Sequence, residues 1–276
     1  MRLSIITINL NNKEGLQKTI DSIISQTYKD YEWIIIDGGS TDGSKELIEK
    51  YDKYVTYWIS EPDKGIYNAM NKGIKIAKGE YLNFMNSGDT FYDSSVLDSV
   101  YKLTKNTNSD IYYGNSLYIY ETKERIFYRP QDITLLYLYK DTILHQSSFI
   151  KRELFNASGY DETLKIVSDW KMWLIWMLQD KKFYYLDLII SRFDAYGIST
   201  TNTILVSQER EKVIKDILPL SIRHSLDKLD QFNNIVKTHP ILLEIYSYLQ
   251  KRWIYTYLSQ LNLKFFKIIN LILKKR

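Results

Sequence analysis

The amino-acid sequence predicts an α/β fold with a mostly parallel β-sheet flanked by helices and a helical extension at its C-terminal end. Two observations predict it. In the N-terminal part of the chain, short apolar runs alternate with segments of helical periodicity, which is the pattern of consecutive βαβ units. From about residue 202 onward the pattern indicates helices alone. Because 45% of the 276 residues are hydrophobic, the chain can bury a substantial core.

Four short apolar runs are predicted to form the first strands of the sheet. Each run is bounded by Asn, Gly, Asp or Pro, as expected for strands that are buried on both faces. These runs are Leu3 to Ile8, Trp33 to Ile36, Val55 to Ile59 and Tyr81 to Met85. Beyond residue 105 the alternation is less regular. The strand-like pieces there are Asp110 to Tyr113, Leu117 to Tyr120 and Phe183 to Leu186.

Helices are predicted between these strands because apolar residues recur at intervals of three and four. The first three sets are Leu16, Ile20, Ile23 and Ile24, then Leu47, Ile48 and Tyr51, then Ile66, Met70, Ile74 and Ala77. Asn11, with Glu14 three residues later, is expected to cap the first helix, and Asp42 or Ser40 the second. A further helix is predicted from about Ser168 to Leu178.

Polar clusters follow each of the four predicted strands. In an open parallel sheet a ligand binds in the crevice beyond the carboxyl ends of the strands, so these clusters should converge on one site. The clusters occupy residues 9–12, 37–43, 61–65 and 86–89. Each cluster alone is compatible with ordinary turn chemistry, and the convergence of all four is therefore the evidence for a site.

Several residues in these clusters suit a nucleotide. Asp37 ends an apolar strand, where its carboxylate could accept hydrogen bonds from a base imide or a ribose hydroxyl, or cap the following turn. Gly38 either permits close approach of the backbone to a ligand or makes a tight turn. Asp63 and Lys64 lie at the start of a predicted helix, where backbone donors and a cation could hold phosphate, although a solvated turn has the same composition.

Asp89 is the candidate metal ligand. It follows a buried strand and offers a hard oxygen ligand for Mn²⁺ or Mg²⁺ bridging a diphosphate. The chain has no Gly-x-Gly-x-x-Gly after the first strand and no Gly-x-x-x-x-Gly-Lys-Ser/Thr, which argues against dehydrogenases and P-loop NTPases. Its three histidines, His145, His224 and His239, are too scattered to predict a zinc site.

Composition restricts the partners and the compartment. A net charge of +4, with both signs interleaved, does not indicate a nucleic-acid-binding protein. The chain has no cysteine, which fits a reducing cytoplasm, and its first residues read as a strand and not as a signal peptide. No apolar run approaches the roughly 18–20 residues that span a bilayer. We therefore expect a cytoplasmic protein.

Five stretches carry a resemblance to a known family. They are residues 4–9, 34–44, 61–73, 79–89 and 145–174, which include Ile-Asp-Gly-Gly-Ser-Thr-Asp-Gly-Ser at 36–44 and Asn-Ser-Gly-Asp at 86–89. These stretches resemble the inverting family 2 glycosyltransferases with a GT-A fold, in particular bacterial cell-surface polysaccharide enzymes. The resemblance covers about residues 1–200, with a nucleotide-sugar half to about 105 and an acceptor half from about 106. Residues 201–276 are left as a helical extension.

The resemblance implies an activity. Such an enzyme moves a sugar, of hexosyl or N-acetylhexosaminyl type, from a nucleotide diphosphate sugar to a hydroxyl of a glycan or lipid-linked acceptor, with inversion. A UDP-sugar is favoured, and surface polysaccharides such as lipopolysaccharide or capsule are the expected products. The residues implied to bind the donor nucleotide are Thr7, Asn9, Asp37, Gly38, Asp63 and Lys64. Further donor or acceptor contacts are expected at Asn68, Ser87, His145, Gln146 and Trp170.

Two positions depart from the family's pattern. Asp89 matches the second acid of an Asp-x-Asp metal element, but Ser87 stands where the first acid belongs. Asp169 matches the aspartate of a Glu-Asp element, with Ser168 in place of Glu. By resemblance Asp169 is the general base that removes the proton of the acceptor hydroxyl. Its position at the start of a predicted helix also suits a simple N-cap.

The C-terminal segment 261–276 has an apolar face opposite several lysines, which is the composition of a helix that lies on an anionic membrane surface. The enzyme would then be peripheral on the inner face of the cell membrane. Alternatively, this face packs on the catalytic domain or on a second subunit, as in a homodimer.

Two other functions compete with transfer. One is a catalytically inactive module that binds nucleotide sugars as a scaffold, which the replacements at Ser87 and Ser168 favour. The other is a sugar-1-phosphate nucleotidyltransferase, which usually has a Gly-rich basic loop after the first strand. Residues 9–12 lack such a loop.

Overall fold

The computed structural model describes residues 2–195 and 197–238. The chain divides into two compact units, Met1–Leu218 and Pro219–Arg276. The second unit contributes α9 (Leu220–Thr238) to the described residues. The first unit holds the sheet.

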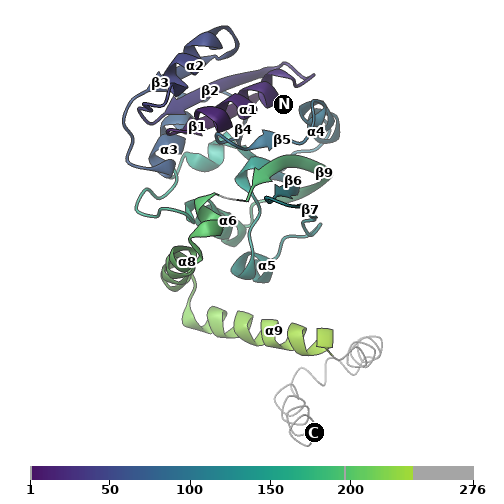
Figure 1. Cartoon of the computed structure of the whole chain (residues 1–276). Coiled ribbons are helices and arrows are strands. Elements are labelled where there is room, and N and C mark those ends of the chain that lie inside the picture. Colours follow the sequence, from purple (N-terminus) through teal and green to yellow (C-terminus); the bar gives the residue numbers. More distant parts are fainter. Residues whose placement is uncertain (1, 196, 239–276) are drawn as a thin grey trace, which may run out of the picture. The chain divides into compact units, whose positions relative to one another are not determined.

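A mixed sheet of nine strands, in the order β3-β2-β1-β4-β8-β6-β9-β5 with β7 beside β6, forms the centre of the first unit (Figure 1). Six strands, β1 to β4, β6 and β9, run in the same direction, and β5, β7 and β8 run against them. The strands are β1 (Leu3–Asn9), β2 (Tyr31–Asp37), β3 (Tyr57–Ser60), β4 (Tyr81–Phe84), β5 (Thr90–Phe91), β6 (Ile111–Ile119), β7 (Glu124–Phe127), β8 (Ser148–Lys151) and β9 (Phe183–Asp194). The predicted α/β fold with a mostly parallel sheet is confirmed.

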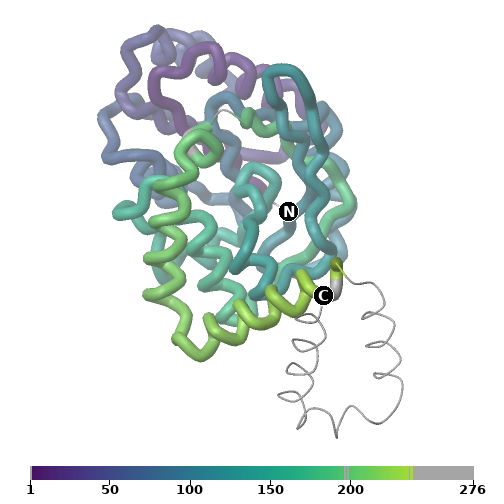
Figure 2. Tube along the Cα trace, turned by 60° about the horizontal axis from the view of Figure 1, so that its bottom comes forward, coloured from purple at the N-terminus to yellow at the C-terminus, as the bar shows by residue number. Residues whose placement is uncertain are grey.

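Helices cover both faces of this sheet. They are α1 (Lys13–Ile24), α2 (Ser44–Lys50), α3 (Ile66–Ile76), α4 (Val96–Thr104), α5 (Leu135–Lys140), α6 (Ser168–Leu178), α7 (Ile198–Thr201) and α8 (Thr203–Ile217), with 3-10 turns η1 (Asp52–Tyr54), η2 (His145–Ser147) and η3 (Arg152–Phe155). Buried residues of α1, α2 and α4 pack on one face, and those of α3, α5, α6 and α8 on the other. Figure 2 shows α8 beside α6, which it contacts.

The core forms because the strands are apolar on both sides. Alternate residues of β1 point to opposite faces, so that Leu3 and Ile5 join the cluster under α1 while Ile6 and Ile8 join the cluster under α3. The sequence pattern of a continuous apolar run is what such a doubly covered strand requires.

Two details differ from the sequence prediction. The predicted strands Asp110 to Tyr113 and Leu117 to Tyr120 are one strand, β6, whose pairing register with β9 shifts around Asn115. The apolar pattern breaks at this irregularity, which made one strand look like two.

The caps of the first two helices also differ by one position. Asn12, and not Asn11, caps α1, because its Oδ1 accepts the backbone N–H of Gly15 at 3.1 Å. Gly43 occupies the N-cap position of α2 without a side-chain cap bond, although Asp42 Oδ1 accepts the N–H of Ser44 at 3.0 Å.

Within the described residues, no helix combines the length and apolar character needed to cross a membrane. The proposed membrane-binding or subunit-binding segment, residues 261–276, lies outside the described residues.

Gly79 offers a test of the packing between the loop before β4 and β1. A Cβ added at Gly79 would lie 2.5 Å from Ser4 Oγ, 2.6 Å from Ser4 N and 2.8 Å from Leu3 C. Since two of these atoms belong to the backbone of the central strand β1, they cannot move aside. We expect Gly79→Ala to destabilise the fold by about 2–3 kcal/mol, measured by chemical denaturation. Gly197→Ala is the control, because its Cβ would meet only Asp194 O, at 3.8 Å. Equal stabilities of the two variants would contradict this account.

Candidate active site

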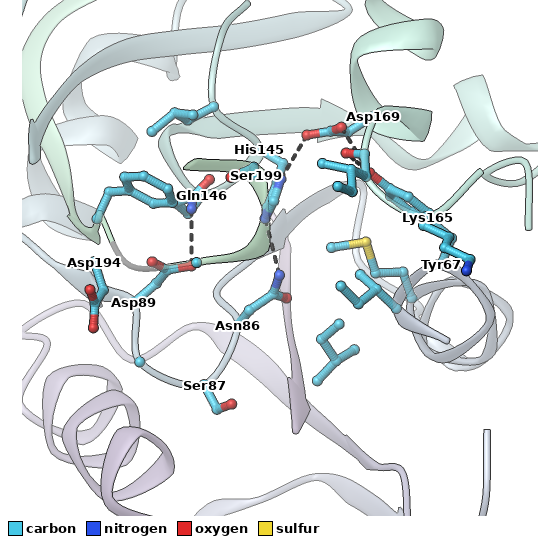
Figure 3. Close-up of a pocket in the computed structure, with 18 of the residues that line it drawn as sticks. Tyr67, Asn86, Ser87, Asp89, His145, Gln146, Lys165, Asp169, Asp194 and Ser199 are labelled. Atoms are coloured by element: carbon cyan, nitrogen blue, oxygen red, sulfur yellow. Dashed lines mark hydrogen bonds and ion pairs between the residues drawn. The ribbon is translucent and has the colours of Figure 1, made fainter. Parts of the chain in front are cut away.

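A cavity of about 720 Å³ opens beyond the carboxyl ends of β1 and β4 (Figure 3). Its wall comes from the ends of these strands, the start of α3, the turn η2, the start of α6 and the segment after β9. The predicted site residues that line it are Asn9, Asp63, Ser87, Asp89, His145, Gln146, Asp169 and Trp170. The sheet thus brings together residues from both halves of the predicted catalytic domain.

Other predicted donor-binding residues do not line this cavity. They are Thr7, Asp37, Gly38, Lys64 and Asn68. Thr7 is fully buried, and its Oγ1 accepts the indole N–H of Trp33 at 3.0 Å. Asn68 donates to Glu162 Oε2 at 2.8 Å. The role of these residues in donor binding stays a prediction.

Asp37 lies at the carboxyl end of β2 and is fully buried. Its two oxygens accept hydrogen bonds from Asn9 Nδ2 at 2.7 Å, Ser40 Oγ at 2.6 Å and Ser60 Oγ at 2.6 Å. Burial alone would raise the pKa of Asp37, but these hydrogen bonds outweigh it and lower the pKa. Asp37 is therefore an ionised anchor that joins the ends of β1, β2 and β3.

Gly38 and Asp63 are placed against each other. A Cβ at Gly38 would lie 2.5 Å from Asp63 Oδ2, so a larger residue would require the Asp63 side chain to shift. Asp63 Oδ1 accepts the N–H of Gly65 at 2.8 Å, which fixes the turn before α3. The second and third polar clusters are therefore in direct contact.

Asp89 occupies one end of the cavity (Figure 3). Gln146 Nε2 donates to its Oδ2 at 2.9 Å, and the backbone N–H of Asp194 also bonds to it. Burial raises the pKa of Asp89 to about 7; the charge of Asp194 adds to this rise, while His145 and the hydrogen bonds oppose it. Asp89 and Asp194 therefore bring two like charges to this end of the cavity, and burial makes the ionised form of Asp89 unfavourable.

These carboxylates could hold a divalent cation. Asp89 is only 7% exposed and its ionised form is disfavoured, which a cation would reverse. Asp194 is a second acid at this end of the cavity, where Ser87 carries no charge. In the described part of the chain no group of three or more His, Cys, Asp or Glu side chains is placed to ligate a metal, so bound ligands such as a diphosphate or water would have to complete the shell. The residues fit a metal that is bound together with substrate.

Asp169 lies at another part of the cavity wall, in the first turn of α6. Its Oδ2 pairs with His145 Nδ1 at 2.9 Å, and its Oδ1 accepts the hydroxyl of Tyr67 at 3.0 Å. Burial would raise the pKa of Asp169, but the hydrogen bond and charge of His145, with further hydrogen bonds, lower it. Val167 occupies the N-cap position, so Asp169 is not a helix cap.

The two ring nitrogens of His145 contact different partners. Nδ1 lies 2.9 Å from Asp169 Oδ2, and Nε2 lies 3.1 Å from Asn86 Nδ2. The ring is therefore held between the loop after β4 and the start of α6. The chain Asn86–His145–Asp169–Tyr67 is continuous along the cavity wall (Figure 3).

Residues of α8 complete the wall of the cavity. This contribution of α8 was not predicted from the sequence. Glu209 is 8% exposed, and its carboxylate accepts the backbone N–H groups of Lys165 at 2.7 Å, Ile166 at 3.0 Å and Val167 at 3.3 Å. These bonds hold the loop that leads into Asp169. The site residues that sequence reasoning did not name are Tyr67, Lys165, Asp194, Glu209 and Arg210, whereas Asn86 belongs to the predicted cluster 86–89. Asp194 had a usable signal, because it is the last residue of the strand β9.

Comparison with known proteins identifies the class. Residues 4–171, more than half of the chain, match the sequence pattern of Glycosyl transferase family 2. Together with the α/β sheet and its cavity, this match defines a glycosyltransferase that uses a nucleotide sugar. The chain belongs to glycosyl transferase family 2, as its motifs predicted.

Relatives of known name are bacterial glycosyltransferases. A PGL/p-HBAD biosynthesis glycosyltransferase of Mycobacterium bovis is 26% identical over 257 residues, which are 90% of this chain and 98% of the relative. An uncharacterized glycosyltransferase of Rickettsia typhi is 29% identical over 223 residues, which are 77% of this chain and 70% of the relative.

Solved structures share the fold. The S. aureus TarS fragment 1–349 in complex with UDP-GlcNAc matches with a TM-score of 0.66 and 18% identity over 92% of this chain and 79% of that chain. In a longer TarS structure the match covers 43% of the TarS chain. The mannosyltransferase PcManGT from Pyrobaculum calidifontis, in complex with GDP-Man and Mn²⁺, matches with a TM-score of 0.61 and 14% identity over 94% of this chain and 83% of that chain. These likenesses confirm the predicted GT-A architecture.

The raised pKa of Asp89 predicts a stability effect in metal-free protein. The pKa rises from the ordinary 3.8 to about 7, so the stability that protonated Asp89 lends is lost as the pH rises from about 4 to above 7. Asp89→Asn removes this loss. With EDTA present, we expect the variant to gain about 1–2 kcal/mol over the wild type at pH 8, or roughly 3–6 °C in Tm, and little at pH 4.5.

Asp37→Asn is the matched control, because the pKa of Asp37 is lowered. Its ionised form stabilises the fold above about pH 4, and this contribution disappears as the pH falls. The control should therefore melt below the wild type at pH 8. Calorimetry at both pH values measures whether each variant melts above or below the wild type. An Asp89→Asn variant that melts below the wild type at pH 8 would contradict the raised pKa of Asp89.

Proposed function

We propose that this chain transfers a sugar of hexosyl or N-acetylhexosaminyl type from a UDP-sugar to a hydroxyl of a glycan or lipid-linked acceptor, with inversion, in the synthesis of bacterial surface polysaccharides. The observation that carries the proposal is the presence in one cavity of two buried carboxylates with opposite pKa shifts, Asp169 and Asp89. The TarS complex with UDP-GlcNAc supports the uridine donor. The mycobacterial relative, which is named a PGL/p-HBAD biosynthesis glycosyltransferase, supports a biosynthetic role.

Asp169 is the general base in this proposal. Its carboxylate is kept ionised, and its two accepted side-chain bonds leave further lone pairs for the hydroxyl of the acceptor. The His145 and Tyr67 contacts hold both oxygens in place, so the base needs no reorganisation when it takes the proton. The deprotonated oxygen attacks the anomeric carbon on the face opposite the diphosphate, and this single displacement inverts the configuration.

The leaving diphosphate is assigned to the end of the cavity that holds Asp89 and Asp194. These carboxylates would hold Mn²⁺ or Mg²⁺, and a divalent cation there supplies the positive charge that a leaving diphosphate requires. The Mn²⁺ in the PcManGT complex supports this choice. Gln146 keeps the Asp89 carboxylate oriented through its 2.9 Å hydrogen bond.

Replacing the base separates catalysis from binding. We expect Asp169→Asn to lower the rate of UDP-sugar turnover by about a thousandfold, because the amide cannot accept the proton. UDP affinity, measured calorimetrically with Mn²⁺, should change less than twofold, since Asp169 lies apart from Asp89. Turnover with water as acceptor gives the rate until an acceptor is identified. Asp98→Asn, on α4 and paired with Lys102 at 2.6 Å, is the control and should leave both quantities unchanged.

Calorimetry with UDP, GDP, CDP and dTDP in Mn²⁺ and then in EDTA tests the donor assignment. Metal-dependent binding of UDP supports the proposed donor, whereas preference for another nucleotide would replace uracil by another nucleobase in the proposal. Binding without turnover, or full turnover by Asp169→Asn, contradicts the proposed base and favours the scaffold.

A further inference from the structure

Arg210 on α8 places a cation in the wall of the cavity. Its guanidinium lies 4.6 Å from the ring centroid of Trp170, and Nη1 donates to the carbonyl of Lys140 at 3.3 Å. Its Nε is buried and has no hydrogen-bond partner among the described residues. Among the described residues it has no ion pair, and the carbonyl of Lys140 is the one acceptor that its guanidinium contacts, so this cavity-lining side chain has donors left over.

The neighbouring carboxylates are already engaged. Asp141 and Asp169 are the acids whose charges act on Arg210. Asp141 lies 3.7 Å from Arg129, and Asp169 is bonded to His145 and Tyr67. Burial of a guanidinium without a contacting anion is unfavourable, and it lowers the pKa of Arg210. A cavity-lining arginine without a contacting anion could bind an anionic group of a ligand.

Lys165 brings a second cation to the same wall. It lines the cavity from the loop before α6, and the described residues engage its backbone but not its ammonium group. Glu209 connects the two, because it precedes Arg210 on α8 and binds the N–H of Lys165 at 2.7 Å. This hydrogen bond ties the backbone of Lys165 to α8, the helix that carries Arg210.

The cations belong to the Asp169 region of the site. Arg210 is influenced by Asp169 and Asp141, whereas the charges that act on Asp89 are those of His145 and Asp194. Since the proposed function places the diphosphate at Asp89 and the attacking hydroxyl at Asp169, an anion bound by Arg210 would come from the acceptor.

We propose that Arg210 and Lys165 form a subsite for an anionic group of the acceptor, a phosphate or a carboxylate close to the hydroxyl that is glycosylated. The inference rests on the proposed function, which it deepens by naming the acceptor class. Arginine suits the role because its planar donors bind both groups in a two-point contact. The stack on Trp170 orients the plane of these donors before the acceptor arrives.

Binding of small anions in the presence of a filled donor site tests the proposal. Protein saturated with UDP and Mn²⁺ is titrated with glycerol 3-phosphate and with methyl glucuronide, followed by ligand-detected NMR. Glycerol and methyl glucoside are the neutral counterparts. We expect at least one anionic probe to bind tenfold more tightly than its neutral counterpart, and the stronger of the two identifies phosphate or carboxylate as the recognised group.

Arg210→Met should abolish this preference, and Lys165→Met should reduce it severalfold. UDP affinity should stay within twofold of the wild type in both. Arg125→Met is the matched control, because Arg125 is stacked on Phe127 at 4.9 Å and does not line the cavity. Should Arg210→Met fail to fold, Arg210→Lys keeps the charge without the planar fork and should still weaken anion binding.

Three results would overturn the inference. One is equal binding of anionic and neutral probes by the wild type. Another is anion binding that Arg210→Met and Arg210→Lys leave intact. The third is a tenfold loss of UDP affinity in Arg210→Met, which would assign the arginine to the donor diphosphate. Failure of the wild type to bind UDP is visible before any anion is added, and it contradicts the proposed function and this inference together.

Discussion

The buried negative charge of Asp169 is the constraint on which the arrangement around the cavity depends. The side chain is only 15% exposed, and an ionised carboxylate at that depth must be hydrogen-bonded or it costs several kcal/mol. Its partners come from separate parts of the chain, Tyr67 from α3 and His145 from η2. The Tyr67 hydroxyl also contacts the carbonyl of Ile166, in the loop just before Asp169, so its one proton is shared between the two acceptors. Satisfying one charge therefore fixes α3, η2 and the start of α6 relative to one another.

This arrangement extends into a helix that the sequence assigns to an extension. Glu209 on α8 is a second buried carboxylate, and it accepts backbone N–H groups of the loop that carries Lys165 and Ile166. Such charge-assisted bonds are stronger than neutral ones. The loop is thus held from one side by Tyr67 and from the other by Glu209. Because α8 supplies both this anchor and Arg210, the cavity draws on residues of the first compact unit that lie beyond residue 200.

Sequence reasoning succeeded where the information is local. Apolar runs revealed the N-terminal strands because each of them is buried on both faces, and the polar residues that follow β1, β3 and β4 do reach the cavity. It could not find Glu209 or Arg210, since only the packing of α8 brings them to the cavity and to the loop before Asp169. The single strand β6 was read as two, because the register shift at its centre interrupts the periodicity on which the reading relied.

The two carboxylates of the cavity show how similar burial leads to different chemistry. Desolvation is the largest influence on both, yet the pKa of Asp169 falls while that of Asp89 rises to about 7. The difference lies in their neighbours, because Asp169 has His145 and Tyr67 as donors whereas Asp89 has Gln146, a backbone N–H and the like charge of Asp194. In the proposed function, the carboxylate that its hydrogen-bond donors keep ionised is the base, and the carboxylate that is ionised only beside a cation is the metal ligand. The neighbours, more than the carboxylates themselves, therefore decide which of the two is ionised in the absence of a cation.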